Sequence, residues 1–131
     1  MLFIINKQVI RPEKYHFVDV LDDYIEQHIS EQIAISDLCS LFHTSRSGLY
    51  RLIKPFLGCN ISKYVTKKRV LCAQKLLRET DYPIMKIAQL TGFYDSYYFA
   101  RVFRQYTGQT AKEYRSLTRG CDAQDGQDET V

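Results

Sequence analysis

The sequence predicts an all-α domain of about seven helices, in which two helix-turn-helix units are joined by a long central helix. Three observations lead to this fold. Apolar residues recur at steps of three and four, as they do on the buried face of an amphipathic helix. Capping residues and glycines divide these stretches into short segments. One pattern of apolar, basic and glycine positions is repeated about 50 positions later in the chain. No segment is predicted as a pair of β-strands.

The first predicted helix follows residues 1–14, which we interpret as an N-terminal arm or linker remnant. Its apolar stripe consists of Phe17, Val20, Leu21, Tyr24, Ile25 and Ile29. Ser36 is the expected N-cap of a short second helix, and Ser45 that of a third helix that ends at Gly58. In the third helix the residues expected to face inward are Leu49, Leu52, Ile53 and Phe56. Pro55 lacks an amide donor and is expected to kink or end this helix.

Capping residues and apolar patterns also predict the helices of the second half of the chain. Asn60 can cap a long helix from about Ile61 to Glu79, which contains neither proline nor glycine. The apolar residues of this helix lie on more than one face, as in a helix that packs against several neighbours. Three further helices follow, and their expected starting residues are Pro83, then Asp95 or Ser96, and finally Thr110 with Glu113 as a capping box.

The repeat consists of a short helix, a tight turn, a second helix and a glycine. A shift of 50 positions aligns Leu49 with Phe99, Arg51 with Arg101, Lys54 with Arg104, Gly58 with Gly108, Asn60 with Thr110, and Tyr64 with Tyr114. The preceding short helices align at a shift of 49, so the second turn is one residue longer. The two copies predict helix-turn-helix units at about 36–57 and 84–107.

The charge is unevenly distributed along the chain. The net charge is +3, but residues 120–131 contain four acids and no base. The preceding part therefore has 18 basic and 11 acidic residues, which favours a polyanionic partner. We expect a folded domain at 15–119 and a disordered acidic tail at 120–131.

Several other classes of protein are not favoured. The four cysteines form no CxxC pair, the three histidines are scattered, and no phosphate-binding glycine loop or catalytic triad stands out. We therefore expect no enzyme activity, no metal and no cofactor. The longest apolar run, Leu2–Ile5, is far shorter than the ~20 residues that span a bilayer. The first residues show no basic region followed by a long apolar stretch, so secretion is not expected. A cytoplasmic protein without membrane contact is expected.

The outward face of the second helix in each unit carries cations and hydroxyl groups. The first set is Arg46, Ser47, Tyr50, Arg51 and Lys54, and the second is Ser96, Tyr97, Ala100, Arg101 and Arg104. Neither set contains an acid, so both faces can donate to DNA phosphates and base edges in the major groove. The central helix would be ~28 Å long, near the ~34 Å between successive major-groove segments. One monomer could then read an asymmetric site.

The residues of the repeat resemble the DNA-binding domain of AraC/XylS-type bacterial transcription regulators, from about Val18 to Arg115. The strongest carriers are Ile87-Ala88, Gly92-Phe93, Asp95, Tyr98-Phe99, Arg101, Phe103, Gly108, Thr110 and Tyr114-Arg115. The resemblance implies two recognition helices in adjacent major grooves. The positions it implies for base reading are Ser47, Tyr50 and Arg51 in the first unit and Ser96, Tyr97 and Arg101 in the second. The expected phosphate contacts are Arg46, Lys54, Lys63, Lys67, Lys86 and Arg104.

The sequence thus predicts a sequence-specific, double-stranded DNA-binding transcription regulator, an activator rather than a repressor. Its expected partners are promoter DNA and RNA polymerase, and it is expected to be a monomer, or a dimer if the chain belongs to a longer protein. The alternative is a helix-turn-helix module that modulates another regulator without reading DNA. For Arg101, a structural pairing with Asp95 or another acid nearby stays open.

Overall fold

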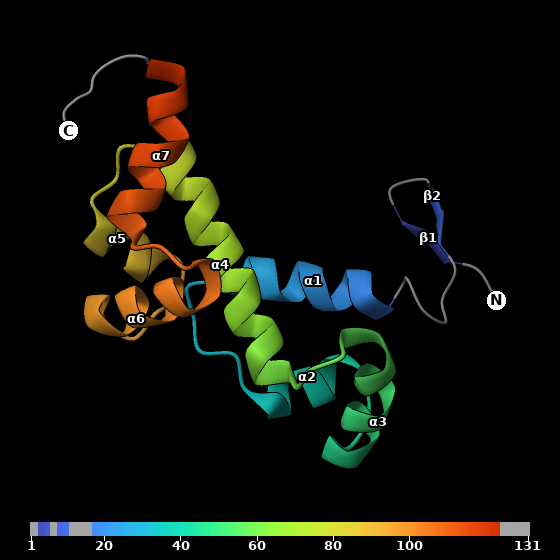
Figure 1. The fold of residues 1–131 in the computed structure, drawn as a ribbon. Helices are drawn as coiled ribbons and strands as arrows, with labels where there is room; N and C mark the ends of the chain where they lie inside the picture. Colours follow the sequence, from blue (N-terminus) through green and yellow to red (C-terminus); the bar gives the residue numbers. More distant parts are fainter. Residues whose placement is uncertain (1–2, 6–7, 11–16, 124–131) are drawn as a thin grey trace. The chain divides into compact units, whose positions relative to one another are not determined.

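The computed structural model describes residues 3–5, 8–10 and 17–123. Seven helices lie in this part of the chain, and Figure 1 labels them in order. Their bounds are α1 (Phe17–Gln27), α2 (Ile35–Leu41), α3 (Arg46–Leu57), α4 (Ile61–Glu79), α5 (Ile84–Leu90), α6 (Ser96–Thr107) and α7 (Ala111–Ala123). The prediction of an all-α domain of seven helices is confirmed. Helix α7 continues to Ala123, past the residue-120 start expected for the acidic tail, whose residues 124–131 lie outside the described residues.

The expectation that no strands pair is wrong near the N-terminus. Strand β1 (Phe3–Ile5) pairs antiparallel with β2 (Gln8–Ile10), and Ile4 lies opposite Val9. β-Branched residues such as these favour extended backbone. Strands of three residues are too short for an alternating pattern to identify them in the sequence. The rest of the predicted arm, at 1–2, 6–7 and 11–14, lies outside the described residues.

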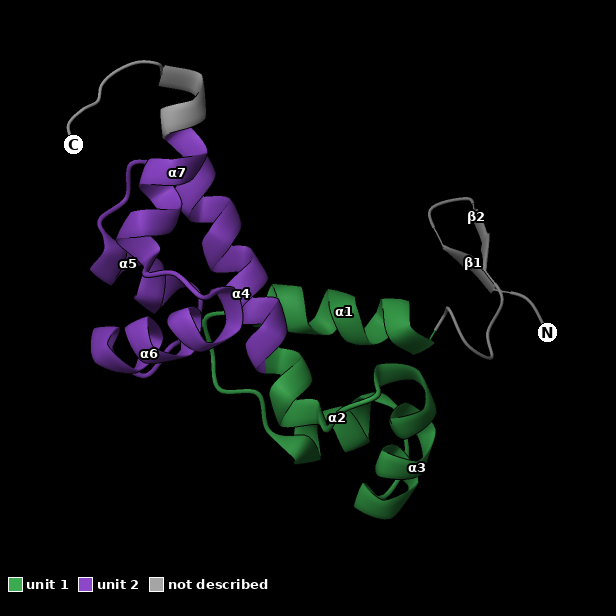
Figure 2. Cartoon of the chain, in the orientation of Figure 1, with its two compact units in different colours: residues 1–65 green, residues 66–131 purple. Residues whose placement is uncertain are grey.

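The chain divides into two compact units, residues 1–65 and 66–131, which Figure 2 shows in different colours. In unit 1, helices α1, α2 and α3 and the first turn of α4 share one core. Its buried members are Phe17, Leu21, Ile25, Leu38, Leu49, Ile53, Ile61 and Val65. Leu52 and Phe56, which were expected to face inward, are each 38% exposed. The buried stripe of α3 is thus narrower than its apolar pattern, because a surface helix buries only the part of its circumference that has neighbours.

Unit 2 comprises the rest of α4 and helices α5, α6 and α7, and its core is aromatic. The buried members are Val70, Ala73, Leu77, Ile87, Ala88, Phe93, Phe99, Val102, Phe103 and Ala111. Ring centroids lie 4.9 Å apart for Phe93 and Phe99 and 5.5 Å apart for Phe99 and Phe103. Tyr114 of α7 continues this row at 5.7 Å from Phe103. The row packs the second recognition helix on the body of its unit.

Most of the predicted caps are found in the structure. Ser45 Oγ accepts from the Gly48 amide at 3.1 Å, and the Asp95 carboxylate accepts from the Tyr98 amide at 2.7 Å. The remaining caps are Asn60, which accepts from Lys63 N at 2.8 Å, and the reciprocal pair of Thr110 and Glu113 at 2.9 and 3.0 Å. Two predictions of this kind are wrong. Ala34, not Ser36, precedes α2, and Pro83 is the N-cap of α5 instead of its first residue.

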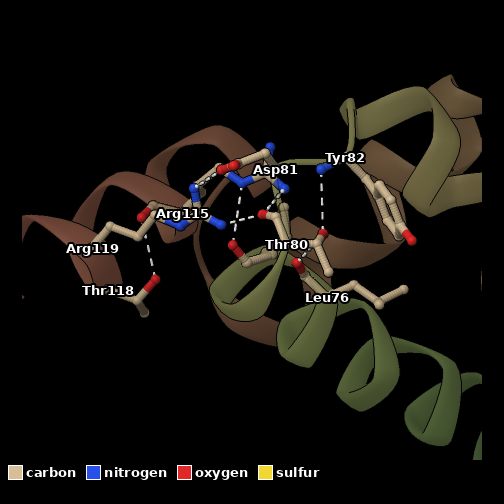
Figure 3. A network of polar contacts seen from close by, with 8 residues as sticks. Leu76, Thr80, Asp81, Tyr82, Arg115, Thr118 and Arg119 are labelled. Carbon is tan, nitrogen blue, oxygen red and sulfur yellow. Dashed lines mark hydrogen bonds and ion pairs between the residues drawn. The ribbon is translucent and has the colours of Figure 1, made fainter.

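Two arginines of α7 hold the end of α4 and the loop that leads to α5 (Figure 3). Arg115 donates to the carbonyl oxygens of Leu77 at 3.2 Å and Thr80 at 3.1 Å. Arg119 also donates to the Thr80 carbonyl and pairs with Asp81 at 2.6 Å. Carbonyls at a helix C-terminus lack partners within the helix, and cations there are favourable. The contacts therefore fix the segment from which the second helix-turn-helix unit begins.

Candidate nucleic-acid interface

The two helix-turn-helix units have equivalent turns. In the first, the amide of Phe42 donates to Leu38 O at 3.0 Å and that of Thr44 to Cys39 O at 3.0 Å. The second unit repeats both bonds 49 positions later, at 3.0 Å from Thr91 to Ile87 and at 3.0 Å from Phe93 to Ala88. Backbone φ is positive at the equivalent positions, 53° at His43 and 80° at Gly92. The repeat in the sequence is therefore also a repeat in local backbone structure.

The glycine that ends each recognition helix and the tyrosine that follows it are also equivalent in the two units. Gly58 and Gly108 both adopt left-handed backbone, and their amides donate to Lys54 O at 3.3 Å and Arg104 O at 2.8 Å. The equivalent tyrosines that follow are both anchored by their hydroxyl groups. Tyr64 donates to Asp22 at 2.6 Å, and Tyr114 accepts from Arg78 at 2.7 Å. Burial, and then the bond to Asp22, raise the pKa of Tyr64, so that its hydroxyl remains a donor.

Helix α3 separates a buried from a cationic face. Leu49 and Ile53 are 0% and 1% exposed, and they hold the helix on the core of unit 1. The other face consists of exposed Arg46, Ser47, Tyr50, Arg51 and Lys54, and no residue of the helix is acidic. Pro55 does not end the helix, which continues to Leu57. The expectation that Pro55 could end α3 is therefore wrong. All five predicted contact residues of α3 are thus accessible to a partner.

Helix α6 has the same division. Phe99, Val102 and Phe103 are buried, whereas Tyr97, Ala100, Arg101 and Arg104 are exposed and Ser96 is half-buried. Tyr97 is 87% exposed, so its whole ring is available to a partner. Helix α6 contains no acidic residue. Asp95, directly before it, accepts a hydrogen bond from the Tyr98 amide as the N-cap of the helix.

Arg101 lies against an aromatic ring instead of an acid. Its guanidinium carbon is 5.4 Å from the ring centroid of Tyr98. Among the described residues, no ion pair joins Arg101 to Asp95. The structural pairing that the sequence left open is therefore absent from this part of the chain. The stacking partner itself was not identified from the sequence, although the spacing of three between Tyr98 and Arg101 is one that places side chains together on a helix.

The remaining predicted phosphate contacts lie outside the recognition helices. Lys63 and Lys67 are exposed on α4, and Lys86 is exposed on α5 with its ammonium 5.3 Å from the ring centroid of Tyr82. Sequence reasoning did not select Lys112, which is exposed in the first turn of α7. At Gly48, an added Cβ would collide with Thr44 Oγ1, so a side chain there would require Thr44 to move.

Other types of site are not found in the described part of the chain. Among its residues, no three His, Cys, Asp or Glu side chains are grouped so that they could hold a metal ion. The described helices include none that is both long and apolar enough to cross a membrane.

Comparison with known proteins gives consistent matches. A family model described as "Helix-turn-helix domain" matches residues 38–116, which cover most of the first helix-turn-helix unit and all of the second. The chain is 33% identical over 100 residues to the probable transcriptional regulator LumQ of Photobacterium leiognathi, covering 76% of this chain and 40% of LumQ. It therefore spans less than half the length of this relative.

Two solved structures resemble the chain closely. One is a transcriptional regulator from Chromobacterium violaceum described as containing an AraC-type DNA-binding domain, with TM-score 0.75, 28% identity, and 86% of this chain and 96% of that chain covered. The other is the DNA-binding domain of the global transcriptional factor AdpA in complex with a target DNA, with TM-score 0.74, 27% identity, and coverage of 82% and 96%.

Proposed function

Since the chain belongs to the AraC-type family of helix-turn-helix DNA-binding domains of transcription regulators, we propose that it binds promoter DNA by inserting α3 and α6 into adjacent major grooves. One observation carries the proposal: equivalent helices of two similarly built units each expose cations and hydroxyl groups and no acid. If these faces were only solvated, nothing would require the two copies to have the same charge pattern. If both faces bind the same polyanion, both must lack acids, because an acid on either face would repel the phosphates.

We assign two kinds of contact to these faces. Side chains that reach base edges specify the sequence, whereas contacts to phosphates set position and affinity. The proposed base-reading residues are Ser47, Tyr50, Arg51, Ser96, Tyr97 and Arg101. The proposed phosphate contacts are Arg46, Lys54, Lys63, Lys67, Lys86 and Arg104. Arg51 is the central assignment, since a guanidinium can bind guanine O6 and N7 together.

The activity of the whole protein follows as a wider proposal. The chain acts as a transcription activator in the cytoplasm, and it contacts RNA polymerase once it is bound upstream. Two different recognition helices within one monomer predict an asymmetric binding site instead of a palindrome. In a longer protein, a further segment would supply dimerisation or effector binding, since LumQ is more than twice as long as the matched region.

The proposal is tested by selecting bound sequences from a random DNA pool and measuring affinity by electrophoretic shift. Six phosphate contacts predict a salt slope of about −5, or a loss of affinity of about 10³-fold between 50 and 200 mM salt. The selected site should have two separate conserved segments about one helical turn apart. DNase footprinting that protects one groove segment only would contradict the insertion of both helices.

Variants at Arg51 separate base reading from general charge. We expect Arg51→Ala to weaken binding to the selected site about 5- to 150-fold, and Arg51→Lys to lose discrimination while keeping non-specific affinity. Lys75→Ala, at an exposed position of α4 outside the proposed contact set, is the matched control and should leave discrimination unchanged. If the wild type shows no salt-dependent DNA binding, the protein-interaction module becomes the better explanation.

A further inference from the structure

The recognition helices α3 and α6 differ at the position three residues before their equivalent arginines, and this position decides whether the arginine has an aromatic neighbour. Arg51 and Arg101 occupy the same place in the repeat, and each follows by three residues the position of Gly48 or Tyr98. On a helix, residues three apart lie next to each other. Arg101 therefore has an aromatic neighbour, and it stacks on this ring at 5.4 Å, whereas Gly48 has no side chain to offer Arg51.

Tyr98 is tied to its surroundings through both its backbone and its ring. Its backbone amide donates to the Asp95 carboxylate at 2.7 Å, which fixes the first turn of α6. Its ring centroid is 6.0 Å from that of Phe93, a buried member of the core. Burial lowers the pKa of the half-buried Arg69 on α4, and the nearby Tyr98 partly opposes this shift. Tyr98 is thus a surface residue (37% exposed) whose orientation depends on the core.

We propose that Tyr98 is a positioning residue for DNA reading: it orients the guanidinium of Arg101 toward the base edge that α6 contacts. The inference rests on the proposed function and extends it. A planar guanidinium must approach guanine edge-on to bond O6 and N7 together. Stacking restricts the rotamers of Arg101 before binding, so less conformational freedom is lost when the base is contacted. Arg51, which lacks such a ring at position 48, must be ordered by the DNA itself.

The test measures base preference position by position, in competition assays with sites that carry each of the four bases. Arg101→Ala locates the position that Arg101 reads. We expect Tyr98→Leu to lower preference at that position about two- to five-fold and to leave preference at the Arg51 position unchanged. Tyr98→Phe keeps the aromatic face and should retain the preference. In an Arg101→Ala background, Tyr98→Leu should have no further effect on preference.

A matched control is available on the same helix. Tyr106 is 44% exposed near the end of α6, and Tyr106→Leu makes the same chemical change two turns away from Tyr98. It should leave base preference unaltered. The inference is overturned if Tyr98→Leu weakens all sequences equally or has no effect on preference. Complete absence of DNA binding by the wild type would instead overturn the proposed function.

A second measurement needs no substitution and so does not depend on how Tyr98 variants fold. In the free protein, the Tyr98 ring should shift the Hδ protons of Arg101 upfield of those of Arg51 in the NMR spectrum. Equal shifts for the two arginines would show that Arg101 is not held on the ring, and would overturn the inference.

Discussion

The glycines that end the two recognition helices allow a prediction in which backbone conformation acts alone. Gly58 has φ of 69° and Gly108 has φ of 79°, and an added Cβ would meet no atom within 4 Å at either position. Replacement by alanine therefore changes no packing. It costs about 1–2 kcal/mol for left-handed backbone in an L-residue and recovers about 0.4–1 kcal/mol from the restricted unfolded chain.

With both terms at the middle of their ranges, the net effect is a loss of about 0.8 kcal/mol for Gly58→Ala and a similar loss for Gly108→Ala. For a chain of this size, it lowers the melting temperature by about 2–4 °C. Urea and thermal unfolding followed by circular dichroism measure both quantities. Gln105→Ala, at an exposed position inside α6, is the control for the change to alanine and should stay within about 0.5 kcal/mol of the wild type.

D-Alanine at position 58 or 108 separates backbone strain from other causes, because D-residues favour positive φ. A semisynthetic protein with D-alanine should be at least as stable as the wild type. The reasoning is refuted if the L-alanine variants match the wild type in stability, or if D-alanine destabilises as much as L-alanine.

Three further predictions concern the core, a cap and an ion pair. Phe103→Ala removes a fully buried ring and should lower the free energy of unfolding by about 3–5 kcal/mol, whereas Leu117→Ala, at a position 56% exposed, should have little effect in the same urea titration. Asn60→Ala removes the cap of α4 and should cost about 1 kcal/mol, most of which Asn60→Asp restores; equal losses in both variants would contradict the capping role. The hydrogen bond and charge of Arg119 lower the pKa of Asp81, so Arg119→Ala should raise that pKa toward its ordinary value of about 3.9, as measured by carbon NMR. Because the pKa is depressed in the folded chain, the pair stabilises above the pKa of the unfolded carboxyl and its contribution is lost as pH falls through the folded pKa. The stability difference between wild type and Arg119→Ala should therefore shrink in acid to the part that comes from the bond to the Thr80 carbonyl, and a difference that does not change with pH would contradict the assignment.

Caps illustrate how far local sequence information reaches. Ser45, Asn60, Asp95 and Thr110 were predicted correctly because a cap bonds an amide two or three residues away. Ser36 fits the same rule but does not cap α2. Ile35, the preceding residue, packs partly buried against the core of unit 1 as the first residue of the helix. Tertiary packing therefore sets the start of α2 two positions earlier than the capping preference does.

By itself, the sequence determined the seven helices, their glycine stops and the two acid-free faces, since each of these depends on residues within a turn or two of one another. The 50-residue repeat is likewise legible in the sequence, because it compares residue types and needs no contact. Only the tertiary structure decided which apolar residues of α3 are buried, because that depends on neighbours from other helices. It also decided the orientation of Tyr98 beside Arg101, which depends on the buried Phe93. The bonds from Arg115 and Arg119 to the end of α4 span 35 to 39 positions, and no local pattern encodes a contact at that separation.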